Sequence, residues 1–280
     1  MPDPAPSLLL LIPAYNEEQR IEPVLREYGA YLRAHYLGRF NIVVVLNGCV
    51  DGTLAVVQKT AAEFPFISAM DFPDAIGKGG AIIEGLKLAS LYDLVGYVDA
   101  DGATAPKDFL DLVERCGEAD CVIGSRWIEG AVLRQEQSGK RQFASRIFHL
   151  IVELFFRMGV RDTQCGAKVI RSAAIEKIHD SLRIADMAFD INLLYSLKRS
   201  GFRILEFPTV WTDKVGSKVV LGKTSITMLL SVIRIRLIYS PFYAWLRPFR
   251  PLETWLYLRL RAPLPRRRPQ KASDAPPLSR

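Results

Sequence analysis

Residues Leu8–Asn47 read LLLLIPAYNEEQRIEPVLREYGAYLRAHYLGRFNIVVVLN. The apolar run Leu8–Ile12 predicts a buried strand, and Phe40–Leu46 predicts a second one. Between them, Glu17–Ala34 predicts a helix, because its apolar residues recur every three or four positions. Strands that are apolar throughout, joined by a helix, are typical of a parallel sheet that is buried on both faces. The sequence therefore predicts an α/β fold.

The same alternation of strands and helices continues beyond this first unit. Further strands are expected at Phe66–Asp71, Leu94–Val98, Ala119–Ile123, Ala167–Arg171 and Phe202–Phe207. Further helices are expected over Thr53–Phe64, Gly79–Ser90, Arg141–Met158 and Phe189–Ser200. We therefore expect a mostly parallel, Rossmann-like sheet flanked by helices.

Charge is distributed unevenly along the 280 residues, whose formal net charge is +7. Up to Lys223 there are 26 basic and 28 acidic residues, whereas from Thr224 onward there are 11 basic and two acidic residues. A near-neutral body with a cationic appendage argues against a nucleic-acid binder and for an enzyme. We expect three parts, residues 1–223, 224–262 and 263–280, the last of them a disordered basic tail.

Composition narrows the class further. The four cysteines lack metal-ligand spacing, so a zinc site is not expected and reduced thiols are. No uncharged apolar run approaches the roughly 18–20 residues needed to span a bilayer. The first residues lack a basic region and a cleavage site, so a signal peptide is not expected.

Polar or glycine-rich loops follow four of the predicted strands, and in open α/β sheets ligands bind at that edge. These loops are Pro13–Glu18, Asn47–Thr53, Gly77–Gly80 and Asp99–Gly102. Asp99 and Asp101 could both reach one Mg²⁺ ion, which one or two carboxylates and substrate phosphates commonly hold. A solvated turn is the alternative, but the other polar loops favour a metal site. Gly77–Gly80 fits a phosphate-binding helix start or an ordinary glycine turn.

These motifs carry a resemblance to a known family. IPAYNEE, NGCVDGT, GKGGAIIEGL, DADGAT and IGSR follow in the order seen in glycosyltransferase family 2 enzymes of the GT-A fold. RDTQCGAK (Arg161–Lys168), MAFDINLLY (Met187–Tyr195) and WTDKVGSK (Trp211–Lys218) resemble the dolichyl-phosphate β-glucosyltransferases and their polyprenyl-phosphate relatives. The resemblance covers roughly Leu8 to Ser240.

The resemblance implies inverting transfer of a sugar from a nucleotide diphosphate sugar to a polyprenyl or dolichyl phosphate. It implies that Asp99 and Asp101 bind Mg²⁺ or Mn²⁺, and that Asp162 is a base or a sugar-positioning carboxylate; we expect Asp101 and Asp162 to be catalytic. The expected nucleotide-binding residues are Pro13, Ala14, Tyr15, Glu17, Asn47, Asp51, Gly77, Lys78, Asp99 and Ala100.

The phosphate of the expected acceptor would need positively charged side chains to bind it. A phosphate monoester has a second pKa near 6, so it is largely a dianion at pH 7 and needs little help from a base. Arginine suits bidentate phosphate contacts. The candidates are Arg126, Arg141, Arg146 and Lys218. For Arg141 and Arg146 a solvated helix face is an equal alternative. For Asp162 we expect positioning to matter more than proton removal, with a helix-end cap as the alternative.

Four positions depart from the family's pattern. Leu46 and Asn47 stand where paired aspartates are usual, and Ala167 and Asn192 stand where relatives carry Phe and Glu. An amide at Asn47 fits a uracil edge and favours a uridine nucleotide, whereas the departures at Ala167 and Asn192 bear on the identity of the sugar. Together with the resemblance to the β-glucosyltransferases, this leads us to expect UDP-glucose as the donor. Alternatives are a GDP-mannose-using polyprenyl-phosphate mannosyltransferase and a non-catalytic nucleotide-sugar sensor on the membrane. A processive synthase is disfavoured because QxxRW is missing, and a sugar nucleotidyltransferase because AYNEE follows the first strand.

The last part of the chain predicts contact with a membrane. Thr224–Tyr239 is apolar apart from a few polar residues, among them Arg234 and Arg236. Aromatic residues then alternate with arginines up to Arg261. Such a segment suits amphipathic helices lying in the interface of an anionic membrane, although packing on the protein core is an alternative. We expect a peripheral, monotopic protein on the cytoplasmic face of a membrane, and we make no prediction of its oligomeric state.

Overall fold

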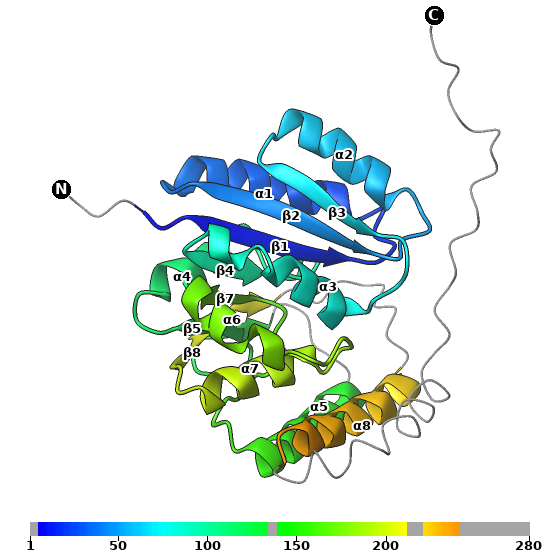
Figure 1. Cartoon of the computed structure of the whole chain (residues 1–280), viewed down its shortest axis with the longest axis vertical. Helices are drawn as coiled ribbons and strands as arrows, with labels where there is room; N and C mark the ends of the chain where they lie inside the picture. The colour runs from blue at the N-terminus through cyan, green and yellow to red at the C-terminus, as the bar shows by residue number, and fades with distance from the viewer. Residues whose placement is uncertain (1–4, 134–138, 212–220, 241–280) are drawn as a thin grey trace, which may run out of the picture.

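The computed structural model describes residues 5–133, 139–211 and 221–240. Within them, seven strands form one mixed sheet with helices on both faces (Figure 1), in the order β3-β2-β1-β4-β7-β5-β8. The strands are β1 (Leu8–Ala14), β2 (Phe40–Asn47), β3 (Ile67–Phe72), β4 (Leu94–Tyr97), β5 (Cys121–Ser125), β7 (Lys168–Arg171) and β8 (Ile204–Pro208). A separate two-stranded sheet pairs β6 (Val132–Leu133) with β9 (Val210–Trp211).

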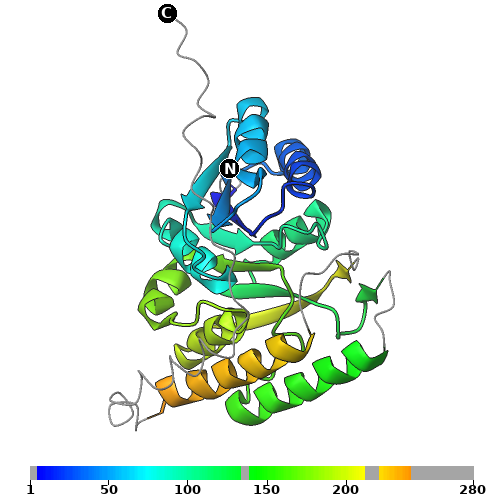
Figure 2. The same cartoon turned by 90° about the vertical axis from the view of Figure 1, so that its right-hand side faces the viewer.

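The helices connect these strands, and two of them, near one end of the molecule, pack against each other. They are α1 (Ile21–His35), α2 (Thr53–Glu63), α3 (Lys78–Leu86), α4 (Pro106–Arg115), α5 (Gly139–Phe156), α6 (Ser172–Ile178), α7 (Phe189–Arg199) and α8 (Leu221–Ile238), with short 3₁₀ turns at Ala89–Leu91 and His179–Ser181. In Figures 1 and 2, α5 and α8 lie side by side at one end of the molecule. Among the described residues, no helix is both long and apolar enough to cross a bilayer.

The two faces of the sheet are buried by alternate residues of each strand. In β1, Leu8, Leu10 and Ile12 pack into one hydrophobic cluster, together with residues of α1, α2 and α4. Leu9 and Leu11 pack into a second cluster, with residues of α3, α5, α6, α7 and α8. Burial on both faces explains why the central strands β1 and β4 are apolar along almost their whole length. The predicted α/β fold is confirmed.

The sheet is mostly parallel, as expected, but β7 runs against its neighbours. It pairs antiparallel with both β4 and β5, whereas the other pairs of this sheet are parallel. Reversal of β7 brings its beginning, rather than its end, to the edge where β4 and β5 end. The loop 162–167 therefore lies beside the residues that follow β4 and β5.

The helix α8 packs on the same core as the rest of the chain. Its Val232 and Ile235 are fully buried in the second cluster, and Ser231 donates a hydrogen bond of 2.5 Å to Asp186. The expected boundary at residue 223 thus falls just inside α8, which begins at Leu221. Residues 241–262 and the expected tail 263–280 lie outside the described residues.

Candidate active site

Two aspartates follow β4 at the carboxyl edge of the sheet. Asp99 Oδ1 lies 2.6 Å from the Lys78 ammonium nitrogen. Its other oxygen, Oδ2, packs against Gly166, where an added Cβ would lie only 2.2 Å from it. Asp101 Oδ1 accepts a hydrogen bond of 2.9 Å from the backbone N–H of Ala103. Both carboxylates are therefore held by neighbouring groups rather than left free to rotate.

The two carboxylates fit the predicted divalent cation. Burial, and then the charge of Asp99, raise the pKa of Asp101, so its ionised form is disfavoured without a nearby cation. Carboxylate oxygens are suitable ligands for Mg²⁺ and Mn²⁺. Over residues 5–133, 139–211 and 221–240 there is no cluster of three or more His, Cys, Asp or Glu side chains that could hold an ion alone. The remaining ligands would come from substrate phosphates and water.

The loops after β1 and β2 are joined by hydrogen bonds. The N–H of Val50 donates to Asn16 Oδ1 at 2.8 Å, and the N–H of Gly52 donates to Glu18 Oε2 at 3.0 Å. In the other direction, the N–H of Glu18 donates to Asp51 Oδ2 at 3.2 Å. The two loops therefore form one rigid wall beside the aspartates, and Asp51 is part of it.

Glu17 belongs to the same network. Both of its carboxylate oxygens accept hydrogen bonds from Arg20, at 2.7 and 2.8 Å, and its N–H donates to Thr53 Oγ1 at 2.9 Å. The Thr53 hydroxyl in turn donates to Asp51 Oδ1 at 2.5 Å. Glu17 and Asp51, both expected to hold the nucleoside, thus also shape the loops that carry them.

Asn47 organises the start of α3. Its Oδ1 accepts hydrogen bonds from the N–H groups of Ile76 and Gly77, at 2.6 and 2.9 Å. Gly77 has a φ of 82°, which glycine adopts without strain, and Lys78 follows it. The amide oxygen that was expected to face a base therefore holds the backbone next to Lys78.

The small residues of the expected nucleotide site also lie at this edge. Ala14 ends β1, and Ala100 stands between the two aspartates; both are buried. Pro13 and Tyr15 are half-buried. Burial, and then the charge of Cys49, raise the pKa of Tyr15, so the phenol is neutral at physiological pH.

Arg126 and Asp162 form an ion pair beside the aspartates. Arg126 donates from Nε to Asp162 Oδ2 at 2.7 Å and from Nη2 to Oδ1 at 2.9 Å. Its backbone N–H also donates to Oδ2, at 3.0 Å. The guanidinium lies 4.9 Å from the centre of the Trp211 ring. Burial lowers the pKa of Arg126, but Asp162 outweighs burial and raises it, so the guanidinium stays charged.

The backbone that carries Asp162 is fixed in turn by Glu206 of β8. The N–H groups of Arg161 and Asp162 each donate to a carboxylate oxygen of Glu206, both at 2.9 Å. The structure thus joins Asp162, expected to be catalytic, with Arg126, expected to hold the acceptor phosphate. Neither acts alone.

A buried charge network lies beneath the aspartates, and none of its side chains was expected to belong to the site. Lys168 is fully buried, and its ammonium lies 2.6 Å from both Asp190 Oδ1 and the carbonyl oxygen of Cys165. Tyr97, the last residue of β4, donates to the same Asp190 oxygen at 2.5 Å. The sequence did contain one signal for this network. Lys168 stands in a predicted buried strand, where a lysine is rare unless its charge is paired.

The other expected phosphate ligands lie elsewhere or outside the described residues. Arg146 is exposed on α5, which agrees with the alternative of a solvated helix face. Arg141 lies in the same helix, near its start. Lys218 lies outside the described residues. Of the four candidates, the structure places Arg126 beside the aspartates.

The two departures at Ala167 and Asn192 are structural. Ala167 is fully buried where the chain enters β7. Asn192 Oδ1 accepts from the N–H groups of Arg183 and Ile184, and its Nδ2 donates to Tyr239 at 3.0 Å. Asn192 therefore ties the loop before α7 to the end of α8.

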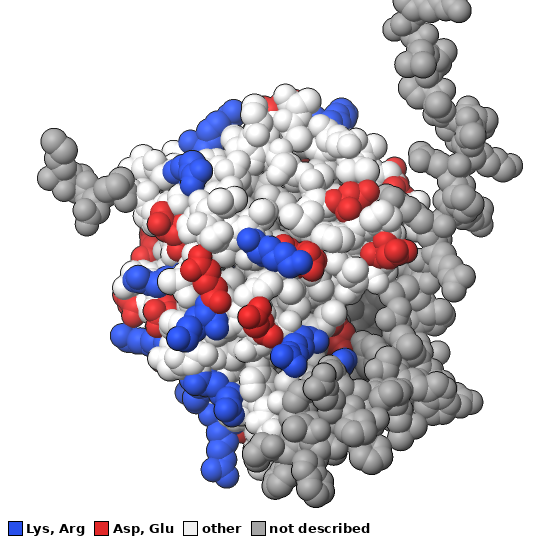
Figure 3. Space-filling model, viewed as in Figure 1, with Lys and Arg blue, Asp and Glu red and all other residues white. Residues whose placement is uncertain are grey.

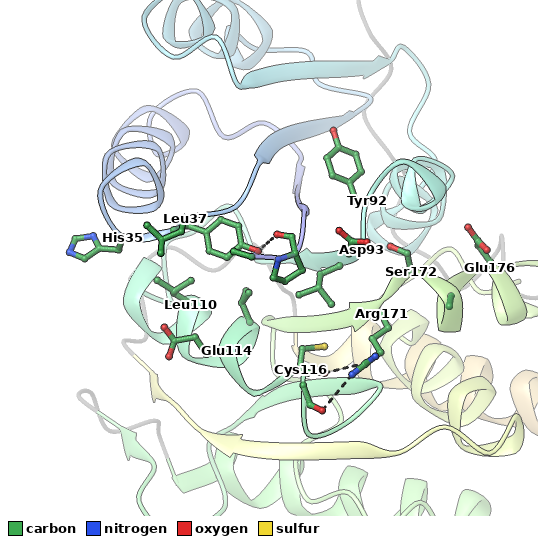
Figure 4. Close-up of a pocket in the computed structure, with 17 residues that line it drawn as sticks. His35, Leu37, Tyr92, Asp93, Leu110, Glu114, Cys116, Arg171, Ser172 and Glu176 are labelled. Carbon is green, nitrogen blue, oxygen red and sulfur yellow. Dashed lines mark hydrogen bonds between the residues drawn. The ribbon is translucent and has the colours of Figure 1, made fainter. Parts of the chain in front are cut away.

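A pocket of about 750 Å³ lies at the opposite edge of the sheet (Figure 4). It opens where β4 begins and β7 ends, between Tyr92, Asp93 and Arg171. The Arg171 guanidinium donates to backbone carbonyl oxygens, including that of Cys116 at 3.3 Å. None of the expected site residues lines this pocket, so we place the active site at the carboxyl edge instead.

Fold and site together define a class of enzyme. The chain matches the model of glycosyl transferase family 2 over residues 10–179, and it belongs to this family. The resemblance carried by the motifs is confirmed, and the protein is a glycosyltransferase.

Two curated relatives show how far the similarity extends. The chain is 31% identical over 268 residues to the dolichyl-phosphate beta-glucosyltransferase of Drosophila melanogaster, covering 89% of this chain and 74% of that protein. It is 33% identical over 228 residues to glycosyltransferase AglD of Haloferax volcanii, covering 80% of this chain. There it spans about a third, 36%, of the relative's length.

Solved structures support the fold. The glucosyl-3-phosphoglycerate synthase of M. tuberculosis superposes with a TM-score of 0.61 at 18% identity, covering 84% of this chain and 82% of that one. The same synthase has been crystallised with Mn²⁺, UDP and glucosyl-3-phosphoglycerate. At this identity the likeness establishes the fold alone.

Proposed function

We propose that this protein transfers glucose from UDP-glucose to a polyprenyl or dolichyl phosphate, with inversion at the anomeric carbon and with the help of Mg²⁺ or Mn²⁺. One observation carries the proposal. The carboxylates of Asp99 and Asp101 and the Arg126–Asp162 ion pair meet at the carboxyl edge of the sheet, joined through the loop that contains Gly166. Carboxylates suit a metal-bound donor, and a guanidinium suits a phosphate acceptor.

On the donor side, Asp99 and Asp101 would hold the divalent cation. Bound there, the cation would act as a Lewis acid that neutralises the departing nucleotide diphosphate. The rigid wall that contains Glu17 and Asp51 would border the nucleoside. Lys78, at the start of α3, would add a positive charge beside the diphosphate.

On the acceptor side, Arg126 would orient the phosphate. Its Nε and Nη2 are used by Asp162, which leaves the Nη1 hydrogens outside that pair. A phosphate oxygen of the dianion would attack the anomeric carbon from the face opposite the nucleotide. The new carbon–oxygen bond forms as the bond between the sugar and the nucleotide breaks. The electron pair of the broken bond leaves with the nucleotide diphosphate. Asp162 would position Arg126 rather than remove a proton.

The choice of sugar and acceptor draws on the relatives. Several of them, from Drosophila melanogaster to Homo sapiens, are dolichyl-phosphate beta-glucosyltransferases with 29–31% identity to this chain. The structural neighbour was crystallised with UDP-glucose. Asn47 adds little to this choice, because its amide oxygen already accepts two backbone hydrogen bonds.

A lipid acceptor requires contact with a bilayer, and two helices offer it. A set of apolar side chains is exposed on α5 and α8. The two helices lie side by side (Figure 2). We call this set the α5–α8 face; it consists of Ile147, Leu150, Leu154, Leu229, Ile233 and Leu237. Leu150 and Leu154 are 68% and 71% exposed. Apolar side chains spaced along one face of a helix are usually buried against the core, so their exposure here is unusual.

The charges around this face suit an anionic membrane. Arg146 and Arg236 are exposed on the two helices, and a groove of about 500 Å³ is lined by Leu154, Arg236 and neighbouring residues. Elsewhere, Figure 3 shows both signs of charge interspersed over the described part of one face. We therefore propose peripheral binding to the cytoplasmic side of a membrane, through α5 as well as through residues 224–262.

The decisive experiment incubates the protein with Mg²⁺ or Mn²⁺, a short polyprenyl phosphate and either UDP-glucose or GDP-mannose. Release of UDP together with a lipid product heavier by one hexose is the expected result. Turnover with GDP-mannose alone would favour the mannosyltransferase alternative. If no nucleotide sugar were consumed while UDP still bound, the sensor alternative would replace the proposed reaction.

A further inference from the structure

The ion pair between Lys78 and Asp99 occupies the carboxylate expected to bind the metal. The two groups are 2.6 Å apart, and their side chains are only 19% and 29% exposed. Lys78 contacts Asp99 Oδ1, whereas Asp99 Oδ2 faces Gly166. A divalent cation bound to that oxygen would meet the ammonium at close range.

The backbone around Lys78 is clamped, so the lysine is held close to this position. An added Cβ at Gly77 would lie 2.3 Å from the carbonyl oxygen of Ala185, and one at Gly79 would lie 2.7 Å from that of Ile184. The N–H of Gly80 donates to the Ala185 carbonyl oxygen at 3.0 Å. The start of α3 therefore cannot move away from the loop before α7 without breaking close contacts, and movement is left to the lysine side chain.

The surroundings keep Lys78 charged. Burial lowers its pKa, but the carboxylates of Asp99, Asp190 and Asp101 outweigh burial and raise it above its ordinary value. Lys78 is thus a cation at neutral pH that neutralises part of an acidic cluster. Lys168 offsets the charge of Asp190.

We propose that Lys78 is the counter-ion of Asp99 before the donor binds, and that it passes to the nucleotide diphosphate when the divalent cation takes its place. This inference rests on the metal-bound nucleotide donor of the proposed function. It predicts that the binding of the divalent cation and the binding of the nucleotide are coupled. A cation that arrives alone must displace the Lys78 ammonium from its closest anion, whereas a cation that arrives with a diphosphate supplies a replacement anion. Metal and nucleotide should therefore bind cooperatively, and Lys78 should be the source of part of that coupling.

The test titrates Mn²⁺ into the full-length protein and follows free Mn²⁺ by electron paramagnetic resonance, with and without UDP. Wild-type protein is expected to bind Mn²⁺ weakly alone and more tightly with UDP. In Lys78→Met, Mn²⁺ affinity without UDP should rise on the order of tenfold, and the gain caused by UDP should shrink by a similar factor. The matched control is Lys87→Met, at the residue that follows the far end of the same helix, where an exposed lysine contacts Glu84.

Equal Mn²⁺ affinity of wild-type protein and Lys78→Met without UDP would overturn the counter-ion role. If neither protein bound Mn²⁺ even with UDP, the metal dependence of the proposed function would fail, and the exchange with it. Lys78→Gln is a second uncharged variant, for use if circular dichroism shows that Lys78→Met is unfolded. Lys78→Arg retains the positive charge and should keep Mn²⁺ binding weak without UDP; a rise equal to that of the Met variant would contradict the proposal.

Discussion

Arg126 and Asp162 are joined by two parallel hydrogen bonds of 2.7 and 2.9 Å, on a carboxylate that is only 2% exposed. Arginine–carboxylate pairs of this geometry fix both orientation and charge. The acceptor-side cation is therefore held by a buried anion, and loss of either partner should disturb the other.

Asp162→Asn should lower turnover by about a hundredfold, since a misplaced positioning group costs that much. The amide oxygen of asparagine can still accept from Arg126 on one side, but the NH₂ group on the other side cannot accept the second guanidinium hydrogen bond. The loss should appear in kcat and in the KM for the acceptor, with no new pH dependence near neutrality. The measurement is a pH–rate profile of both proteins; recovery of the variant at high pH would instead identify Asp162 as a base.

Lys168→Met should destabilise the protein by about 3–5 kcal/mol, because it leaves Asp190 buried without its ion-pair partner. Urea unfolding followed by circular dichroism measures this free energy. The matched control is Lys107→Met, which removes an exposed pair with Asp111 and should leave stability unchanged. Equal stability of wild-type protein and Lys168→Met would show that the network is not needed for folding.

Asp101→Asn should stabilise the protein in the absence of metal. The pKa of the Asp101 carboxyl is raised in the folded protein, so stability falls as the pH rises from the unfolded-state pKa to the folded-state pKa, and the full cost is present above both. The amide removes this cost at neutral pH. The amide oxygen can still accept from Ala103. The variant's melting temperature should therefore exceed that of wild-type protein in EDTA. The rise in melting temperature on addition of Mn²⁺ and UDP should be smaller for the variant than for wild-type protein. A lower melting temperature in EDTA would contradict this account of the site.

Replacing Leu150 and Leu154 by Gln should weaken binding to vesicles of phosphatidylcholine and phosphatidylglycerol by about tenfold for each leucine, the effect of removing one apolar side chain from the interface. Both side chains are exposed, so folding should be unaffected. Leu37→Gln is the control, because Leu37 is 95% exposed at the turn between α1 and β2. Flotation with vesicles at moderate salt is the measurement, and unchanged flotation of the double variant would exclude α5 from the membrane contact.

Much of the fold could be predicted from the sequence because buried strands are recognisable by their apolar composition. The unbroken apolar runs predicted the strands of the large sheet, and the motif order predicted the family. Helices α4 and α6 were not predicted. The pairing of β6 with β9 was not predicted either, since it joins short segments that are far apart in the chain.

The site was predictable as a set of residues but not as a set of partners. Asp99 and Asp101 could be identified because they follow a strand at a fixed spacing. Lys78 and Asp99 were both expected near the nucleotide, yet nothing in the sequence indicates that they form an ion pair. The exposed apolar stripe of α5 was missed because its residues also fit an ordinary core helix.

The sequence by itself determined which segments form the large sheet, which edge carries the polar loops and which family the chain belongs to, because these depend on local composition and order. Only the tertiary structure decided that β7 runs antiparallel and so brings Asp162 to Arg126, and that Lys168 meets Asp190 under the aspartates. Strand direction and ion-pair partners depend on contacts between residues distant in the chain, where many pairings are compatible with the same local pattern.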